Sequence, residues 1–185
     1  MPTIKKILLL SVALFIYAAA HAQIEVAKLS SKGFSPFGFG GFLNFSIPVT
    51  DNSAAVVEAG VYIFSKDDYH MAVAPVLGGY RQFFGQDDFG FYAEPVAGYT
   101  FGGTDIQKLD ANGNALYKAD GSQVDQSVKG PIGGVGFGYL FEPSGSVQFN
   151  ISLRAEHVFV GAGNPSLSII ALRISHGFTF GHRHG

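Results

Sequence analysis

Six charged side chains interrupt segments that are otherwise rich in apolar and aromatic residues. Carboxylates that lie close together can act as general acid and base, and a row of charges can conduct ions. Arginines and glutamates in equal number can instead neutralise one another through forked hydrogen bonds, so we favour a structural role. We call these residues the lumen charge network: Glu58, Arg81, Glu94, Arg154, Glu156 and Arg173.

Other residues that could carry chemistry do not combine into a recognisable site. His176, His182 and His184 cluster late in the chain, but a metal site needs ligands on one rigid face. The stretch from Asp110 to Asn114 begins like a calcium loop, yet the glycine and glutamate that such a loop requires farther on are missing. The sequence contains no cysteine and no Gly-x-Ser-x-Gly motif. We therefore predict no catalytic residue, no cofactor and no metal.

The segment from Val147 to Glu156 indicates which elements hold the charges. Apolar and polar residues alternate along it without a break, and successive strand residues point to opposite sides. The strand must therefore separate an apolar medium from a polar one. In a soluble sandwich the polar face would lie outside. Because the pattern recurs along a chain with an export signal, we interpret the apolar medium as lipid and the polar one as a barrel interior.

Residues 1–22 have the pattern of a cleavable signal peptide. Two lysines precede an apolar run at 7–20, and the small residues Ala20 and Ala22 suit a signal peptidase. The alternative is a membrane anchor, for which the run is short. We predict a signal peptide over 1–22 and one barrel domain over 23–185, located in the outer membrane.

Composition supports an all-β fold. Glycine and phenylalanine are abundant, with 25 and 18 residues, and the chain has no cysteine for disulfides. A closed sheet leaves no edge to protect, which suits such a protein. The formal net charge of −2 argues against a nucleic-acid partner.

About eight strands can be assigned from alternation and from the turn residues between them. Eight antiparallel strands can close into an up-and-down transmembrane β-barrel, whose interior has room only for side chains. The predicted strands cover 23–29, 37–49, 54–65, 70–84, 89–101, 130–141, 147–159 and 167–180.

The first predicted strand has the weakest pattern, because Glu25 and Lys28 fall on opposite faces. An even number of strands, with both ends of the barrel domain in the periplasm, is the main argument for it. The only long connection, 103–129, is polar and is expected outside the cell, since such barrels place short turns in the periplasm.

Two further patterns fit a narrow barrel in a membrane. The glycines Gly134, Gly136 and Gly138 share the inward face of one strand, where neighbouring long side chains need space. Aromatic residues near strand ends are typical of a girdle at the lipid headgroups, and the alternative is an aromatic soluble core. These aromatic residues are Phe37, Phe39, Tyr99, Phe101, Phe137, Tyr139, Phe141, Phe178 and Phe180.

The chain resembles the small outer-membrane β-barrel domain proteins of Gram-negative bacteria, especially those of Bacteroidetes. The resemblance implies outer-membrane lipid and the outer-membrane insertion machinery as partners. That machinery reads an aromatic residue at the C-terminus, whereas Phe180 is followed here by a polar tail. The motifs that carry the resemblance are 20–23 (Ala-His-Ala-Gln), 75–81 (Pro-Val-Leu-Gly-Gly-Tyr-Arg), 91–99 (Phe-Tyr-Ala-Glu-Pro-Val-Ala-Gly-Tyr) and 171–180 (Ala-Leu-Arg-Ile-Ser-His-Gly-Phe-Thr-Phe).

The sequence thus predicts a non-enzymatic outer-membrane barrel with a plugged, charged lumen. Its role would be structural or adhesive, with the connection 103–129 presented to an extracellular partner that the sequence does not identify. The main alternative is a soluble exported barrel that binds an apolar small ligand inside, which would invert the facing of every strand. A lipid-modifying enzyme is the third interpretation.

Overall fold

The structure is a computed structural model, and it describes most of the chain after the predicted leader. The leader lies outside the described part except for Ala22, where the first strand begins. The described residues are 22–31, 35–67, 69–85, 88–107, 117, 120, 125–141, 147–160 and 166–178.

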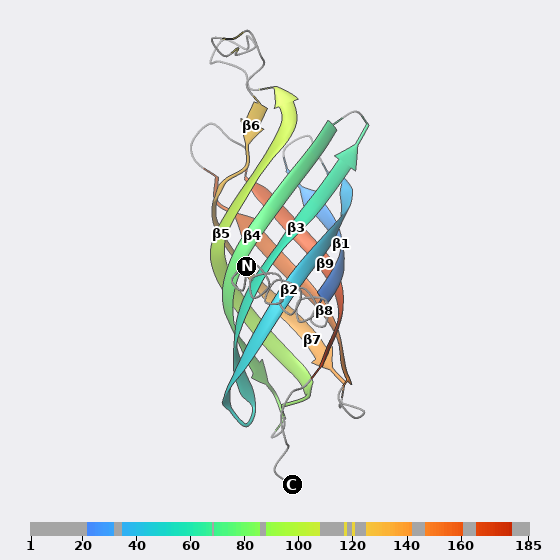
Figure 1. The fold of residues 1–185 in the computed structure, drawn as a ribbon, viewed down its shortest axis with the longest axis vertical. Helices are drawn as coiled ribbons and strands as arrows, with labels where there is room; N and C mark the ends of the chain where they lie inside the picture. The colour runs from blue at the N-terminus through green and yellow to red at the C-terminus, as the bar shows by residue number, and fades with distance from the viewer. Residues whose placement is uncertain are drawn as a thin grey trace, which may run out of the picture.

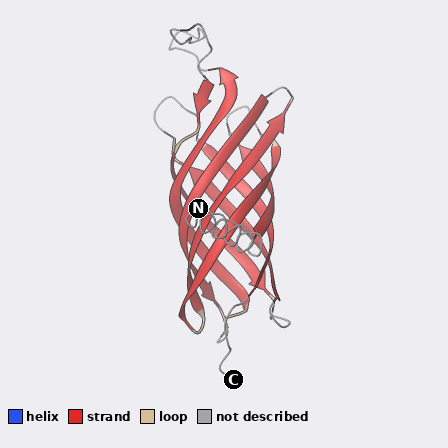
Figure 2. Ribbon diagram, in the orientation of Figure 1, coloured by secondary structure: helices blue, strands red, loops and turns tan. Residues whose placement is uncertain are grey.

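Strands make up all the regular structure in the described part of the chain (Figure 2). No helix among these residues is long and apolar enough to cross a membrane. The strand bounds lie within a few residues of the predicted ones, except where β5 continues farther. The strands are β1 (Ala22–Ser30), β2 (Phe37–Thr50), β3 (Ser53–Lys66), β4 (Tyr69–Phe83), β5 (Gly90–Gln107), β6 (Asp125–Ser127), β7 (Gly130–Leu140), β8 (Val147–Val158) and β9 (Leu167–Phe178).

Eight of these strands close into a barrel in which every pair is antiparallel (Figure 1). Each strand pairs with its neighbours along the chain, and β1 pairs with β9 to complete the ring. The strands are strongly tilted against the long axis of the barrel in Figure 1, as closure of a staggered sheet requires. The predicted fold class, a closed antiparallel up-and-down barrel, is confirmed.

The first strand, which had the weakest sequence pattern, is a full member of the ring. It pairs with β2 over Ala22–Lys28 and with β9 over Gln23–Ser30. Glu25 is buried inside the barrel, whereas Lys28 is exposed outside, with its Nζ 5.4 Å from the centre of the Phe37 ring. The two charges that weakened the prediction therefore serve opposite faces of a normal strand.

The connection predicted over 103–129 is partly strand, which corrects the sequence interpretation. β5 runs on to Gln107, and β6 returns beside it through the pairs Gly103 with Ser127 and Gln107 with Asp125. This two-stranded extension stands above one end of the barrel, at the top of Figure 1. We call that end the loop end and the opposite one, where β2 turns into β3, the turn end.

The outer face of the barrel is apolar along its whole height. Large hydrophobic side chains such as Ile24, Phe39, Ile63 and Leu153 are more than half exposed. Exposed aromatic residues lie near the strand ends, as Phe37 and Phe101 do at the loop end and Phe91 and Phe141 at the turn end.

Three aromatic residues of the predicted girdle need comment. Phe137 lies in the middle of β7, opposite Ala93 and Leu153, and so belongs to the apolar belt between the girdles. The side chain of Phe178 and the whole of Phe180 lie outside the described part of the structure.

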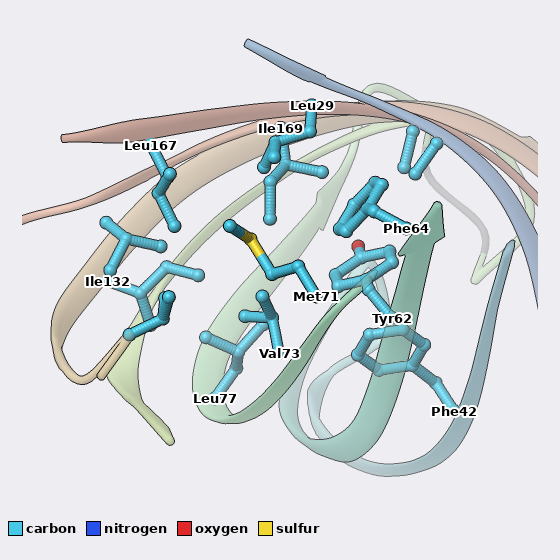
Figure 3. Packing of buried hydrophobic residues seen from close by; sticks show 14 of the residues in the cluster. Leu29, Phe42, Tyr62, Phe64, Met71, Val73, Leu77, Ile132, Leu167 and Ile169 are labelled. Atoms are coloured by element: carbon cyan, nitrogen blue, oxygen red, sulfur yellow. The ribbon is translucent and has the colours of Figure 1, made fainter. Parts of the chain in front are cut away.

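The interior is polar only in part, which also corrects the expectation that hydrophilic residues fill it. Toward the loop end, apolar side chains from many strands point toward one another in a compact cluster (Figure 3). A smaller cluster of Phe83, Tyr92 and Leu140 lies toward the turn end. The larger cluster contains Ala27, Leu29, Phe42, Tyr62, Phe64, Met71, Val73, Leu77, Val96, Val128, Ile132, Val158, Leu167, Ile169 and Ala171.

Candidate functional site: the charged lumen

The charged residues of the lumen come from the inward faces of six strands. Because neighbouring residues on a strand alternate in facing, most of these charges are flanked by outward apolar residues such as Val57, Ala93 and Leu153. All six members of the lumen charge network are less than a tenth exposed. A seventh buried charge, Glu25 from β1, joins them.

Arg154 on β8 lies at the centre of the network. Its guanidinium donates to Glu58 and Glu94, and Arg154 Nη1 lies 3.5 Å from Glu156 Oε1. Four steps around the ring separate β8 from β3, the strand of Glu58, so this ion pair spans the barrel. One guanidinium thus ties opposite walls together.

Arg173 lies on β9, the strand next to β8, and makes a second set of contacts. Its Nε donates to Glu25 Oε1 at 2.5 Å, and its Nη2 donates to Gln23 Oε1 at 2.7 Å and Glu58 Oε2 at 3.0 Å. A longer ion pair of 3.8 Å joins Arg173 Nη1 to Glu94 Oε1. Glu58 and Glu94 therefore each form ion pairs with both Arg154 and Arg173.

Arg81 connects the charges to the turn end of the barrel. Its Nε and Nη2 both lie 2.6 Å from Glu94 Oε2, and its guanidinium carbon lies 4.5 Å from the centre of the Tyr92 ring. The Tyr92 hydroxyl in turn donates to Asn150 Oδ1 at 2.9 Å, and Asn150 donates to Ser175 Oγ at 3.3 Å. Polar contacts therefore continue below the ion pairs.

Uncharged side chains complete the hydrogen bonding of the carboxylates. Asn44 on β2 donates to Glu58 Oε1. The Tyr62 hydroxyl on β3 donates to Glu25 Oε2 at 2.7 Å and lies 3.3 Å from Glu156 Oε2. Tyr62 also packs in the apolar cluster, so it marks the boundary between the charged and apolar parts of the interior.

Sequence reasoning brought six of these residues forward and missed Glu25, Gln23 and Tyr62. Ion pairs join the predicted residues of β8 and β9 to those of β3 and β5. The signal for Glu25 was present, since alternation along β1 places it opposite Ile24 and Val26.

The inward glycines of β7 lie beside these long side chains. A Cβ atom at Gly138 would lie 2.5 Å from the Tyr92 hydroxyl and 2.6 Å from Ser152 Cβ. One at Gly134 would lie 2.5 Å from the Ala155 carbonyl oxygen and 2.9 Å from Glu156 Cγ. At Gly136 the nearest atom would be Arg154 Nε at 3.6 Å, an ordinary contact. Two of the three glycines therefore provide space that a side chain would take away.

This arrangement is suited to holding strands together. A catalytic carboxylate must reach a substrate, whereas the glutamates here are buried, and Glu25, Glu58 and Glu94 are bonded to arginines from other strands. In the described part of the chain, only Thr100 Oγ1 and Arg154 Nε are buried side-chain polar atoms without a hydrogen-bond partner. No three side chains among the described residues form a group that could hold a metal ion, and His182 and His184 lie outside them.

Comparison with known proteins was made at the levels of sequence and fold. No protein-family model matches the sequence, and no curated protein matches it.

Solved structures of small outer-membrane barrels share the fold. Neisserial surface protein A superposes with a TM-score of 0.59 and 13% identity, covering 86% of this chain and 95% of its own. Ail, the attachment invasion locus protein of Yersinia pestis, solved with the heparin analogue sucrose octasulfate, gives 0.55 and 12%, covering 84% and 95%. At these identities the likeness is one of fold alone.

Proposed function

We propose that this protein is an integral outer-membrane β-barrel without enzymatic activity, with a structural or adhesive role at the cell surface. The observation that carries the proposal is the facing of the strands. Exposed aliphatic and aromatic residues cover the outside, whereas arginines and glutamates are buried within. A fold of this kind is stable only where an apolar medium surrounds it.

The exposed apolar surface of this barrel would be costly in water. Transfer of such surface from water is favourable by about 25 cal/mol per Å², and soluble monomers rarely expose apolar patches of more than a few hundred Å². Here exposed apolar residues lie on each of the eight strands that form the ring. Acyl chains are the medium that would cover the whole circumference.

Aromatic residues near both strand ends support the same placement. Phe37, Phe101 and Phe159 are exposed toward the loop end, and Phe91 and Phe149 toward the turn end. Aromatic side chains favour the boundary between headgroups and hydrocarbon, and two such levels would mark the two surfaces of the bilayer.

The soluble alternative requires the opposite facing. A barrel that carries an apolar ligand in water would place its hydrophobic residues around an internal cavity and its charges outside. In the described interior, apolar side chains such as Leu29, Met71 and Ile169 pack against one another, and buried ion pairs lie beyond them. The facing observed therefore favours the membrane proposal.

The loop end is the part of the protein that we assign to surface interactions. The paired extension of β5 and β6 projects from this end, whereas β2 and β3 are joined at the other by the short turn Asp51–Asn52. Barrels of this architecture carry short turns in the periplasm, which would direct the extension outward. An adhesive role would therefore depend on the connection between β5 and β7.

Extraction of the cell envelope tests the membrane proposal directly. The protein should stay in the membrane fraction through washes with high salt or carbonate and should dissolve only in detergent. Unheated samples should migrate on gels differently from boiled ones, because a barrel held by its sheet resists unfolding in cold dodecyl sulfate. Release by washing without detergent, together with heat-independent migration, would overturn the proposal.

Lipid analysis tests the absence of enzymatic activity. Expression of the protein should leave the acylation pattern of lipid A unchanged relative to cells with an empty vector. A variant in which Glu58 and Glu94 are both replaced by glutamine is the comparison if a change is observed. Modified lipid A in cells with the wild-type barrel would contradict the non-enzymatic assignment.

A further inference from the structure

The charges buried in the described lumen do not balance. Four glutamates face three arginines, and all seven residues are less than a tenth exposed. If every side chain were ionised, the lumen would hold one uncompensated negative charge in a place shielded from water, which is strongly unfavourable. The residues are Glu25, Glu58, Glu94, Glu156, Arg81, Arg154 and Arg173.

The hydrogen bonds around Tyr62 indicate which glutamate is the exception. A phenol has one hydrogen to donate, and two carboxylates lie beside this hydroxyl. The bond to Glu25 Oε2 is the shorter, at 2.7 Å, against 3.3 Å to Glu156 Oε2. If Tyr62 donates to Glu25, an ionised Glu156 would place one acceptor oxygen against another.

Glu25 is well supplied with donors, whereas Glu156 is not. Glu25 Oε1 receives Arg173 Nε at 2.5 Å, so both of its oxygens accept a hydrogen bond. Glu156 Oε1 has only the contact of 3.5 Å with Arg154 Nη1, and that arginine is bonded to Glu58 and Glu94.

The two residues that pair with Glu156 across the sheet offer it no hydrogen-bonding side chain. It pairs with Gly134 on β7 and with Ile169 on β9, and Ile169 belongs to the apolar cluster. Charged and titratable groups face it from β1, β3, β8 and β9. They are Glu25, Glu58, Tyr62, Arg154 and Arg173.

We propose that Glu156 is retained in the folded barrel as a neutral carboxylic acid whose proton points to the Tyr62 hydroxyl oxygen. The Tyr62 proton then points to Glu25, and Glu25, Glu58 and Glu94 are the three carboxylates that balance the three arginines. The lumen thus contains a proton-binding site at the boundary of its charged and apolar parts. When this proton is lost at alkaline pH, the lumen gains an uncompensated negative charge beside Glu25, and the barrel becomes less stable.

Infrared spectroscopy of the folded barrel in detergent micelles tests the proton directly. At neutral pH the wild-type protein should show one carbonyl band of a protonated carboxylic acid, and the band should shift in heavy water. Glu156→Gln should lack this band, whereas the exposed control Asp51→Asn should keep it. A wild-type spectrum without the band, or a band that persists in Glu156→Gln, would overturn the proposal.

Unfolding by urea provides the second readout. Glutamine has the shape of a neutral glutamic acid, so Glu156→Gln should form the heat-modifiable barrel with a urea midpoint close to that of the wild type at neutral pH. The wild-type midpoint should fall on raising the pH through the range in which the band disappears, and the Glu156→Gln midpoint should not. Glu25→Gln leaves Arg173 short of a carboxylate and should lower the midpoint more. Failure of Glu156→Gln to fold, or equal losses in the two variants, contradicts the proposal.

Discussion

Arg154 illustrates how the stability of a whole barrel can depend on one buried side chain. Its side chain is 1% exposed and contacts glutamates from β3, β5 and its own strand. Buried ion pairs contribute little net stability compared with apolar residues of the same shape, but removing one partner leaves the other buried and uncompensated. The arginine is therefore far harder to replace than its three contacts would suggest.

Replacing Arg154 by methionine tests this asymmetry. Glu58 and Glu94 would lose their central partner, and we expect the free energy of unfolding to fall by about 3–5 kcal/mol. Urea unfolding in lipid vesicles, followed by circular dichroism, measures the change. Lys66→Met, at an exposed position near the loop end of β3, is the matched control and should lie within about 0.5 kcal/mol of the wild type. Equal free energies of unfolding for the two variants would show that the loss of Arg154 does not destabilise the barrel.

At the scale of the element, β7 is shaped by what its neighbours place in the lumen. Its inward face carries glycines because Tyr92 from β5 and Glu156 from β8 extend across it. Its outward face carries exposed apolar residues such as Val135 and Phe137. One strand therefore meets two different packing demands through simple alternation.

The pair Gly138→Ala and Gly136→Ala separates a crowding effect from a general effect of glycine. A Cβ at position 138 would lie 2.6 Å from Ser152 Cβ, which cannot move without the strand. We expect a loss of about 1–3 kcal/mol there. At position 136 the space is open to 3.6 Å, so the change should stay within about 1 kcal/mol. The same unfolding assay compares the two, and equal losses would refute the crowding argument.

The outward face of β8 provides a second test at this scale. Leu153 is 56% exposed near the middle of the strand, and an arginine there would face hydrocarbon in the proposed bilayer. Leu153→Arg should cost about 2–4 kcal/mol in bilayers, whereas Ser30→Arg, at the loop end of β1, should cost about 0–1 kcal/mol because arginine reaches water there. Similar costs at both depths would argue against a bilayer around the barrel.

At the scale of the whole molecule, the barrel is divided along its axis as well as across its wall. Apolar packing fills the interior toward the loop end, ion pairs fill the middle, and a small aromatic cluster lies toward the turn end. Side chains from different strands therefore meet at each of these levels of the described interior. Such an interior fits the anchoring role proposed above better than it fits the conduction of ions.

Cysteine scanning along Val147 to Glu156 tests the placement of the molecule in a membrane. The chain has no cysteine, so each introduced thiol is unique. Fluorophores on Cys at 149, 151 and 153 should be quenched by a lipid-phase quencher, because these positions are exposed on the outer face. Thiols at 150 and 152 should escape both this quencher and a membrane-impermeant reagent. Labelling of all five positions by the membrane-impermeant reagent would contradict the proposed placement in a membrane.

The sequence by itself determined which side chains face outward and which face inward. Alternation with a period of two is a local property, so Phe149, Ile151 and Leu153 could be assigned to one face before any partner strand was known. Turn residues likewise located most of the strand ends. The strand β1 and the paired extension of β5 were harder, because their stability comes from neighbours rather than from their own pattern.

Only the tertiary structure decided which inward residues meet. Arg154 and Glu58 are 96 residues apart and lie on opposite walls, so their contact depends on the number of strands and on the stagger with which the sheet closes. The same closure brings Tyr62 between Glu25 and Glu156 and separates the apolar part of the interior from the charged part. Facing is fixed within a strand, whereas partnership across a lumen exists only after the ring is complete.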